Sequence, residues 1–157
     1  MVENLIVSDG TKDQKYTILY NQIKALTEGE DDIIANMANI SSMIHQTFGF
    51  WWTGFYRVRR NELILGPFQG PLACSRIPYG KGVCGTAWKE ARTQIVPDVE
   101  KFPGHIACSS LSRSEIVVPV FFDGEITAVL DIDSKYLSTF DETDAAWLEK
   151  IAELIGR

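Results

Sequence analysis

The sequence predicts an α+β fold in which helices pack on one mostly antiparallel sheet. Apolar residues recur with helical spacing near both ends of the chain, and short segments with strand character lie between them. The dipeptide Asp123-Gly124 also joins two of these segments as a hairpin turn, which makes their pairing antiparallel. Hairpin-linked strands with helices at both chain ends are typical of an α+β architecture.

Three long helices are expected, two near the N-terminus and one near the C-terminus. Their apolar positions are Tyr16, Leu19, Tyr20, Ile23 and Leu26 in residues 12–28, Ile33, Ile34, Met37, Ile40 and Ile44 in residues 31–48, and Leu148, Ile151 and Ile155 in residues 142–155. Asp31 and Asp32 stand where acidic residues favour a helix start. Residues 1–11 are expected to be poorly ordered or peripheral.

Segments with strand character fill the middle of the chain. In chain order they are residues 51–59, 61–65, 71–77, 94–96, 115–122 and 125–133. Pro71 restricts the third of them to a strand start or a sheet edge. A glycine-rich turn and a short helix at 83–91 follow this third segment, and a loop at 97–114 precedes the hairpin.

Composition and charge bound the class of protein. The 157 residues suit one domain, 1–157, and the 45% hydrophobic and 23% charged residues indicate a globular chain. The formal net charge of −6 argues against a nucleic-acid partner, because phosphate binding needs clustered Lys and Arg. The one tight basic cluster, Arg57, Arg59 and Arg60, is interpreted as a solvated hairpin tip.

Targeting signals and cysteine count indicate the compartment. The first ten residues lack the basic and apolar regions of a signal peptide, and the longest apolar runs are too short to span a bilayer, so no membrane partner is expected. The three cysteines, Cys74, Cys84 and Cys108, are odd in number, which excludes a fully paired disulfide framework within one chain. A reducing, cytoplasmic location is therefore expected. By number alone, buried thiols that act as small hydrophobic residues are the commoner interpretation.

Two other chemistries have weak support. Gly80, Gly82 and Gly85 match the spacing of a dinucleotide-binding turn, but no buried apolar strand of a βαβ unit precedes them. His105 and Cys108 stand three apart, yet a structural zinc site needs four close ligands. No cofactor or metal is therefore expected.

The loop at 97–114 is rich in serine. Its serines near Cys108 are Ser109, Ser110, Ser112 and Ser114. No nucleophile-elbow pattern accompanies them, so they are interpreted as solvating a mobile loop.

A loop cysteine and three acids form a stronger constellation. Cys108 lies in the serine-rich loop, where a thiol is expected to be reachable. Asp131 and Asp133 lie two apart on a strand, so their side chains point to the same face. Glu115 stands where the loop becomes a strand. Such acids either bind something or are solvated at an exposed strand end, and the spacing leaves both interpretations open.

Two aromatic residues share one face of the first predicted strand. Trp52 and Tyr56 are four apart, and Gly54 lies between them. The glycine either leaves room for a ligand or marks a bulge. Most aromatic pairs on strands belong to a core, so the pattern alone does not assign these two residues to a pocket.

Five stretches of the chain carry a resemblance to a known family. They are GFY at 54–56, GKGVCG at 80–85, FPGHIAC at 102–108, SRSEIVVP at 112–119 and LDIDS at 130–134. In this order and spacing, which includes all three cysteines, they resemble the free methionine-(R)-sulfoxide reductases. The resemblance extends from about Tyr16 to the end of the chain. It implies a stand-alone GAF domain, in agreement with the element order above.

The resemblance implies a role for each cysteine. Cys108 is similar to the nucleophile that attacks the sulfoxide sulfur, Cys74 to the resolving thiol and Cys84 to an auxiliary cysteine near the pocket. Attack and loss of methionine leave a sulfenic acid, with which a second thiol condenses to a disulfide. The implied reductant of that disulfide is an external dithiol, thioredoxin.

The resemblance also implies the substrate contacts. Glu115, Asp131 and Asp133 are similar to the acids around the substrate, and Trp52 and Tyr56 to the walls that hold its S-methyl end. Three acids crowded in one pocket cannot all ionise cheaply, so one is expected to stay protonated and to give its proton to the sulfoxide oxygen. Another is expected to stay charged and to meet the substrate's ammonium group.

A small-molecule sensor is the rival interpretation. GAF domains often regulate an attached output domain, but the GAF-like span takes up this whole sequence, and a sensor does not need three cysteines in this arrangement. The sequence therefore favours an enzyme that acts on free methionine-(R)-sulfoxide, with thioredoxin as its protein partner. The resemblance also allows a homodimer.

Overall fold

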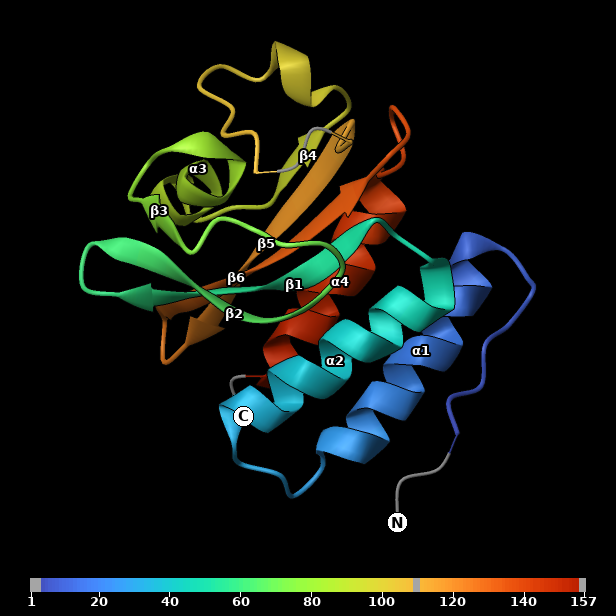
Figure 1. The fold of residues 1–157 in the computed structure, drawn as a ribbon. Coiled ribbons are helices and arrows are strands. Elements are labelled where there is room, and N and C mark those ends of the chain that lie inside the picture. Colours follow the sequence, from blue (N-terminus) through green and yellow to red (C-terminus); the bar gives the residue numbers. More distant parts are fainter. Residues whose placement is uncertain (1–3, 109–110, 156–157) are drawn as a thin grey trace.

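The structure is a computed structural model that describes residues 4–108 and 111–155, and Figure 1 shows their arrangement. In chain order the elements are α1 (Lys12–Thr27), α2 (Ile33–Phe48), β1 (Trp52–Arg59), β2 (Glu62–Gln69), β3 (Arg76–Pro78), α3 (Gly82–Glu90), β4 (Gln94–Val96), the 3₁₀ turn η1 (Val99–Lys101), β5 (Ser114–Phe122), β6 (Glu125–Ser134) and α4 (Glu142–Ile155). The strands form one sheet in the order β3-β2-β1-β6-β5-β4, and all neighbouring pairs are antiparallel. The predicted α+β fold is confirmed.

The predicted helices and the hairpin form for local reasons. The Asp32 side chain accepts the Ala35 backbone N–H at 3.0 Å and so caps α2, which begins one residue later. Asp123 and Gly124 have φ angles of 50° and 80°, as a two-residue turn between β5 and β6 requires. Within the described part of the chain, no helix is both long enough and apolar enough to cross a membrane.

Two strands differ from the prediction. β2 continues to Gln69, beyond the predicted end at Leu65, because the register with β1 shifts between Gly54 and Tyr56. Such a bulge accommodates a proline, here Pro67, which has no N–H to give to the ladder.

β3 covers Arg76–Pro78, so the prediction of a strand over residues 71–77 is wrong for most of that segment. The Pro71 carbonyl accepts the indole N–H of Trp52 at 3.1 Å, and the Cys74 carbonyl accepts the Tyr56 hydroxyl at 2.8 Å. Residues 71–75 are therefore held as a loop by side chains of β1.

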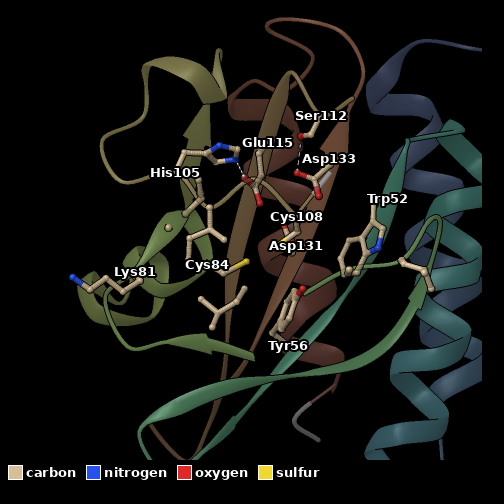
Figure 2. Close-up of a pocket in the computed structure, with 16 residues that line it drawn as sticks. Trp52, Tyr56, Lys81, Cys84, His105, Cys108, Ser112, Glu115, Asp131 and Asp133 are labelled. Carbon is tan, nitrogen blue, oxygen red and sulfur yellow. Dashed lines mark hydrogen bonds and ion pairs between the residues drawn. The ribbon is translucent and has the colours of Figure 1, made fainter. Parts of the chain in front are cut away.

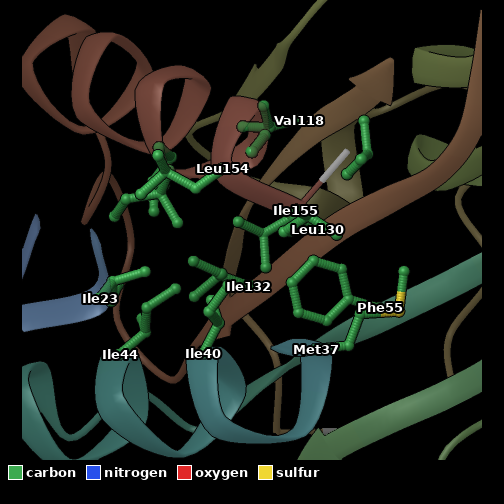
Figure 3. Close-up of a cluster of buried hydrophobic side chains, with 14 of the residues drawn as sticks. Ile23, Met37, Ile40, Ile44, Phe55, Val118, Leu130, Ile132, Leu154 and Ile155 are labelled. Atoms are coloured by element: carbon green, nitrogen blue, oxygen red, sulfur yellow. The ribbon is translucent and has the colours of Figure 1, made fainter. Parts of the chain in front are cut away.

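The sheet separates two hydrophobic clusters. Helices α1, α2 and α4 cover one face, where Ile40, Phe55 and Leu130 belong to the larger cluster (Figure 3). Helix α3 packs on the opposite face, where Tyr56 and Val129 belong to the second cluster.

Strand β6 is buried on both faces rather than on one. Alternation predicted a core face and a polar face, and Ala128, Leu130 and Ile132 do face the helical layer. On the other face, however, Val129 and Asp131 are also buried, since α3 covers them. The buried Asp131 and the half-buried Asp133 of this strand therefore line an interior, whereas Glu125 at its start is exposed.

Candidate functional site

The register of three adjacent strands brings the predicted site residues into one row. Trp52 of β1 pairs with Asp133 of β6, and Asp133 pairs with Glu115 of β5. One step along the same face, Gly54 pairs with Asp131. Because side chains alternate along each strand, these five positions point to the same side of the sheet, the side that α3 covers.

A pocket with a volume of about 40 Å³ lies over this row. Figure 2 shows the side chains that line it. Seven of the eight predicted site residues line it: Trp52, Tyr56, Cys84, Cys108, Glu115, Asp131 and Asp133. The eighth, Cys74, is joined to the lining residue Cys108. The sequence therefore selected residues that the fold brings together.

The three acids lie in a desolvated group. Glu115 and Asp131 are buried and Asp133 is half-buried, so the alternative of exposed strand-end acids is wrong for the first two. Burial raises the pKa of Glu115 well above its usual range, and the charges of Asp131 and Asp133 raise it further. Burial and the charge of Asp131 likewise raise the pKa of Asp133. Burial also raises the pKa of Asp131, although hydrogen bonds with Glu115 and Cys84 oppose the shift.

The Cys84 thiol projects from the first turn of α3 into the same group. Its Sγ and one carboxylate oxygen each of Glu115 and Asp131 lie within 4.8 Å of one another. Burial raises the pKa of Cys84, and the neighbouring acids Asp131 and Glu115 raise it further, so this thiol is held protonated. A buried, protonated thiol is a poor nucleophile.

The glycines around Cys84 have structural roles. Gly80 and Gly82 have φ angles of 73° and 63°, which favour glycine. A Cβ on Gly85 would lie 2.8 Å from the Pro78 carbonyl oxygen, so only glycine lets α3 pack this closely against the turn. The turn brings Cys84 over the acids.

A disulfide joins Cys74 and Cys108, whose Cα atoms are 5.4 Å apart. The resemblance implied this pair, which spans two loops 34 residues apart in sequence. Cys74 lies in the loop before β3, and Cys108 lies in the loop after η1. In the second loop the Ile106 side chain packs against Gly82, where an added Cβ would lie 3.2 Å from it. The disulfide thus ties two loops at the pocket.

Trp52 and Tyr56 are both core residues and pocket walls. Their ring centroids are 5.9 Å apart and their exposed fractions are 4% and 2%. Gly54 marks a bulge, since the register of β1 with β2 shifts next to it, and it does not leave room for a ligand. A Cβ there would collide with Phe68 and lie 2.8 Å from the Trp52 ring. Burial raises the pKa of the Tyr56 hydroxyl, which therefore remains the donor to the Cys74 carbonyl.

Two pocket residues had been given other interpretations from the sequence. Ser112 was assigned to a solvating loop, but its hydroxyl donates to Asp133 Oδ1 at 3.0 Å (Figure 2). His105 was considered for zinc with Cys108, whereas its Nε2 lies 3.9 Å from Glu115 Oε1. Burial lowers the pKa of His105, so the imidazole is neutral near pH 7. Ser109 and Ser110 lie outside the described residues. Only tertiary packing of the loop reveals these contacts.

The fold matches a known family. A family model described as GAF domain matches residues 27–157. Together, this match, the antiparallel sheet and the covered pocket define the class of protein as a GAF domain, one whose pocket carries cysteines and buried acids.

Relatives narrow the class further. A GAF domain-containing protein A from Dictyostelium discoideum is 54% identical over 156 residues, which cover 99% of each chain. A free methionine-R-sulfoxide reductase from Saccharomyces cerevisiae is 46% identical over 85% of this chain and 79% of its own length. The crystal structure of a free methionine-R-sulfoxide reductase from Neisseria meningitidis, in complex with its substrate, aligns with a TM-score of 0.96 at 49% identity, covering 99% of this chain and 94% of that one. The chain belongs to the free methionine-R-sulfoxide reductase family.

Proposed function

We propose that the chain reduces free methionine-(R)-sulfoxide to methionine through a thiol cycle, with Cys108 as nucleophile and Cys74 as resolving thiol. The observation that carries the proposal is the disulfide between these two residues beside a pocket that holds three acids. Cys84 is less suited to attack, because it is buried and its pKa is raised. We assign it an auxiliary part in holding Asp131.

The acids divide two tasks between them. An amino-acid ammonium group needs a negative partner, and a sulfoxide oxygen is a poor leaving group until it gains a proton. Burial and mutual repulsion raise the pKa values of Glu115 and Asp133, so the cluster keeps a proton near neutral pH. Binding of the ammonium then stabilises the remaining negative charge.

The chemistry balances without a cofactor. The Cys108 thiol and the sulfoxide give methionine and a Cys108 sulfenic acid, so that the oxygen moves from the substrate to the enzyme. The Cys74 thiol then condenses with the sulfenic acid, which releases water and forms the disulfide. An external dithiol reduces the disulfide by exchange.

The reductant and the location follow from this cycle. We propose thioredoxin as the dithiol and the cytoplasm as the compartment, because disulfide exchange needs a reducing pool. Cys74 and Cys108 are both half-buried, so the disulfide is partly exposed to such a partner. A homodimer remains a separate proposal, which light scattering on the purified chain would test.

The pocket is expected to select free amino acids. The enzyme should reduce free methionine-(R)-sulfoxide, with little action on the (S) epimer or on peptide-bound sulfoxide, because only a free amino acid offers an ammonium to Glu115, Asp131 and Asp133. The measurement is methionine release from free and N-acetylated (R)-sulfoxide under a dithiol. Equal rates on the two would show that the acids do not recognise an ammonium group.

Trp52 is expected to contribute to substrate affinity beyond its part in the core. Truncation to Ala would destabilise the fold by about 3–5 kcal/mol, since the ring is buried. A variant that unfolds cannot report on substrate binding, so Trp52→Phe is the better variant. It should raise KM for the sulfoxide, because the smaller ring leaves the methyl end in looser contact and removes the hydrogen bond to Pro71.

Trp88→Phe is the matched control for that substitution. Trp88 packs against the same cluster and against Tyr79, with ring centroids 4.7 Å apart, but it is not a pocket-lining residue. Steady-state kinetics and denaturant unfolding on both variants separate the two roles. If KM rises equally in both, Trp52 acts through the core alone.

A further inference from the structure

The acids and Cys84 form a cluster whose chemistry goes beyond amino-acid binding. The Cys84 thiol, a Glu115 oxygen and an Asp131 oxygen all lie within 4.8 Å of one another, and all three residues are buried. Glu115 and Asp131 come from the neighbouring strands β5 and β6, and Cys84 comes from α3, which covers that face of the sheet (Figure 2).

One polar atom of this cluster is left without a partner. Asp131 Oδ1 is buried and has no hydrogen-bond partner among the described residues, and the residue is only 5% exposed. A buried carboxylate oxygen in this state is costly unless a donor or a cation meets it. Asp131 lines the pocket, so a donor or cation that enters lies next to this side chain.

We propose that Cys84, Glu115 and Asp131 bind one thiophilic divalent cation, of which Zn²⁺ is the probe, and that this ion excludes the amino-acid substrate. Binding of the ion displaces the Cys84 proton. The resulting thiolate with two carboxylates is a ligand set that zinc accepts, whereas Mg²⁺ and Ca²⁺ prefer oxygen ligands alone. His105 is a nitrogen donor next to this group, since its Nε2 lies 3.9 Å from Glu115 Oε1. Closure of the cluster around an ion requires the ligand atoms to approach one another by small side-chain movements.

The size of the pocket favours an ion in the disulfide form of the chain. Its volume of about 40 Å³ exceeds the roughly 10–15 Å³ that one water-sized sphere needs, so an ion and a water fit. The ion and the ammonium group of an amino acid would both use Glu115 and Asp131, so the two ligands compete. This consequence for catalysis rests on the proposed function, but the binding of the ion does not.

The test titrates Zn²⁺ into the oxidised full-length chain by calorimetry. In this form Cys74 and Cys108 are joined, so Cys84 is the remaining thiol and the other two cannot bind the metal. We expect one ion per chain, no comparable binding of Mg²⁺, and a thiolate-to-metal charge-transfer band when Co²⁺ replaces Zn²⁺. Failure here with intact reductase activity would overturn the metal site alone, and the converse result would overturn the proposed function alone.

Variants locate the site. Cys84→Ser should abolish the cobalt band. Cys84→Ser and Asp131→Asn should each weaken Zn²⁺ binding by at least about 10–100-fold, because substitution of residues that only support metal ligands already causes a loss of this size. Glu62→Gln, on β2 at the far side of the sheet from β5, is the control and should bind like the parent chain. Binding that is unchanged in Cys84→Ser, or a parent chain that shows no cobalt band, would overturn the proposal. The cobalt band of the parent chain decides the question even if a variant fails to fold.

Discussion

Cys108→Ser is expected to abolish even a single turnover. The substitution removes the only thiol that both lines the pocket and lies in a loop where it can meet a sulfoxide, since Cys84 is buried with a raised pKa. Serine is close in size, so the fold should survive. The measurement is methionine release from reduced enzyme and excess free (R)-sulfoxide without added dithiol.

The other two cysteines give contrasting controls, Cys74→Ser in the same assay and Cys84→Ser in steady-state turnover with a dithiol. Cys74→Ser should release about one methionine per chain and then stall as a sulfenic acid, which a sulfenic-acid trap would label on Cys108. Cys84→Ser should keep at least partial turnover with a dithiol, because an auxiliary thiol is not consumed. Full activity in Cys108→Ser would remove this residue from the chemistry. A stall in Cys84→Ser instead of Cys74→Ser would exchange the roles of those two.

Glu115→Gln is expected to lower reductase activity by about 10²–10⁴-fold, the range for loss of a general acid or base. Asp133→Asn should behave in the same way. The amide keeps the shape of the side chain but provides neither the charge nor the proton. Steady-state turnover of free (R)-sulfoxide, with circular dichroism to verify the fold, measures the effect.

The same variant should change the pH dependence of stability in a defined direction. Burial and neighbouring acids raise the pKa of Glu115 in the folded chain, so the folded state binds this proton more tightly than the unfolded state, whose glutamate titrates near 4.3. Stability from this group is therefore fully present below about pH 4 and is lost as pH rises through the folded pKa. Glu115→Gln cannot ionise, so its free energy of unfolding should fall less steeply with rising pH.

Glu125→Gln is the matched control, because Glu125 is exposed at the start of β6 and lies outside the pocket. It should leave both the turnover and the pH dependence of unfolding as they are. Near-full turnover in both Glu115→Gln and Asp133→Asn would mean that these carboxylates are structural. A Glu115→Gln variant whose stability keeps the parent's pH dependence would contradict the raised pKa.

Local patterns predicted the parts of this fold that local forces determine. Helix α2 begins directly after Asp32, one of the two acids expected at a helix start, and the two-residue turn at Asp123 and Gly124 sets the β5–β6 pairing. Alternation was enough to assign Asp131 and Asp133 to one face, whereas the family resemblance added Glu115 to them. The β5–β6 pairing places Glu115 opposite Asp133.

The parts that could not be predicted depend on contacts distant in sequence. Residues 71–75 form a loop because side chains of β1, Trp52 and Tyr56, hold the Pro71 and Cys74 carbonyls. β2 passes through Pro67 because a bulge in its pairing with β1 removes the need for that N–H. Local periodicity predicts neither the loop nor the bulge. The burial of Asp131 could not be predicted from local sequence either, since it depends on where α3 packs.

The most direct test of the account is a single-turnover experiment on the reduced parent chain. Reduced enzyme is mixed with one equivalent of free methionine-(R)-sulfoxide without a dithiol, then quenched with acid, and methionine and the linked cysteine peptides are both quantified. We expect about one methionine for each new Cys74–Cys108 disulfide. Methionine release with no link, or with a dominant link between Cys84 and Cys108, would contradict it.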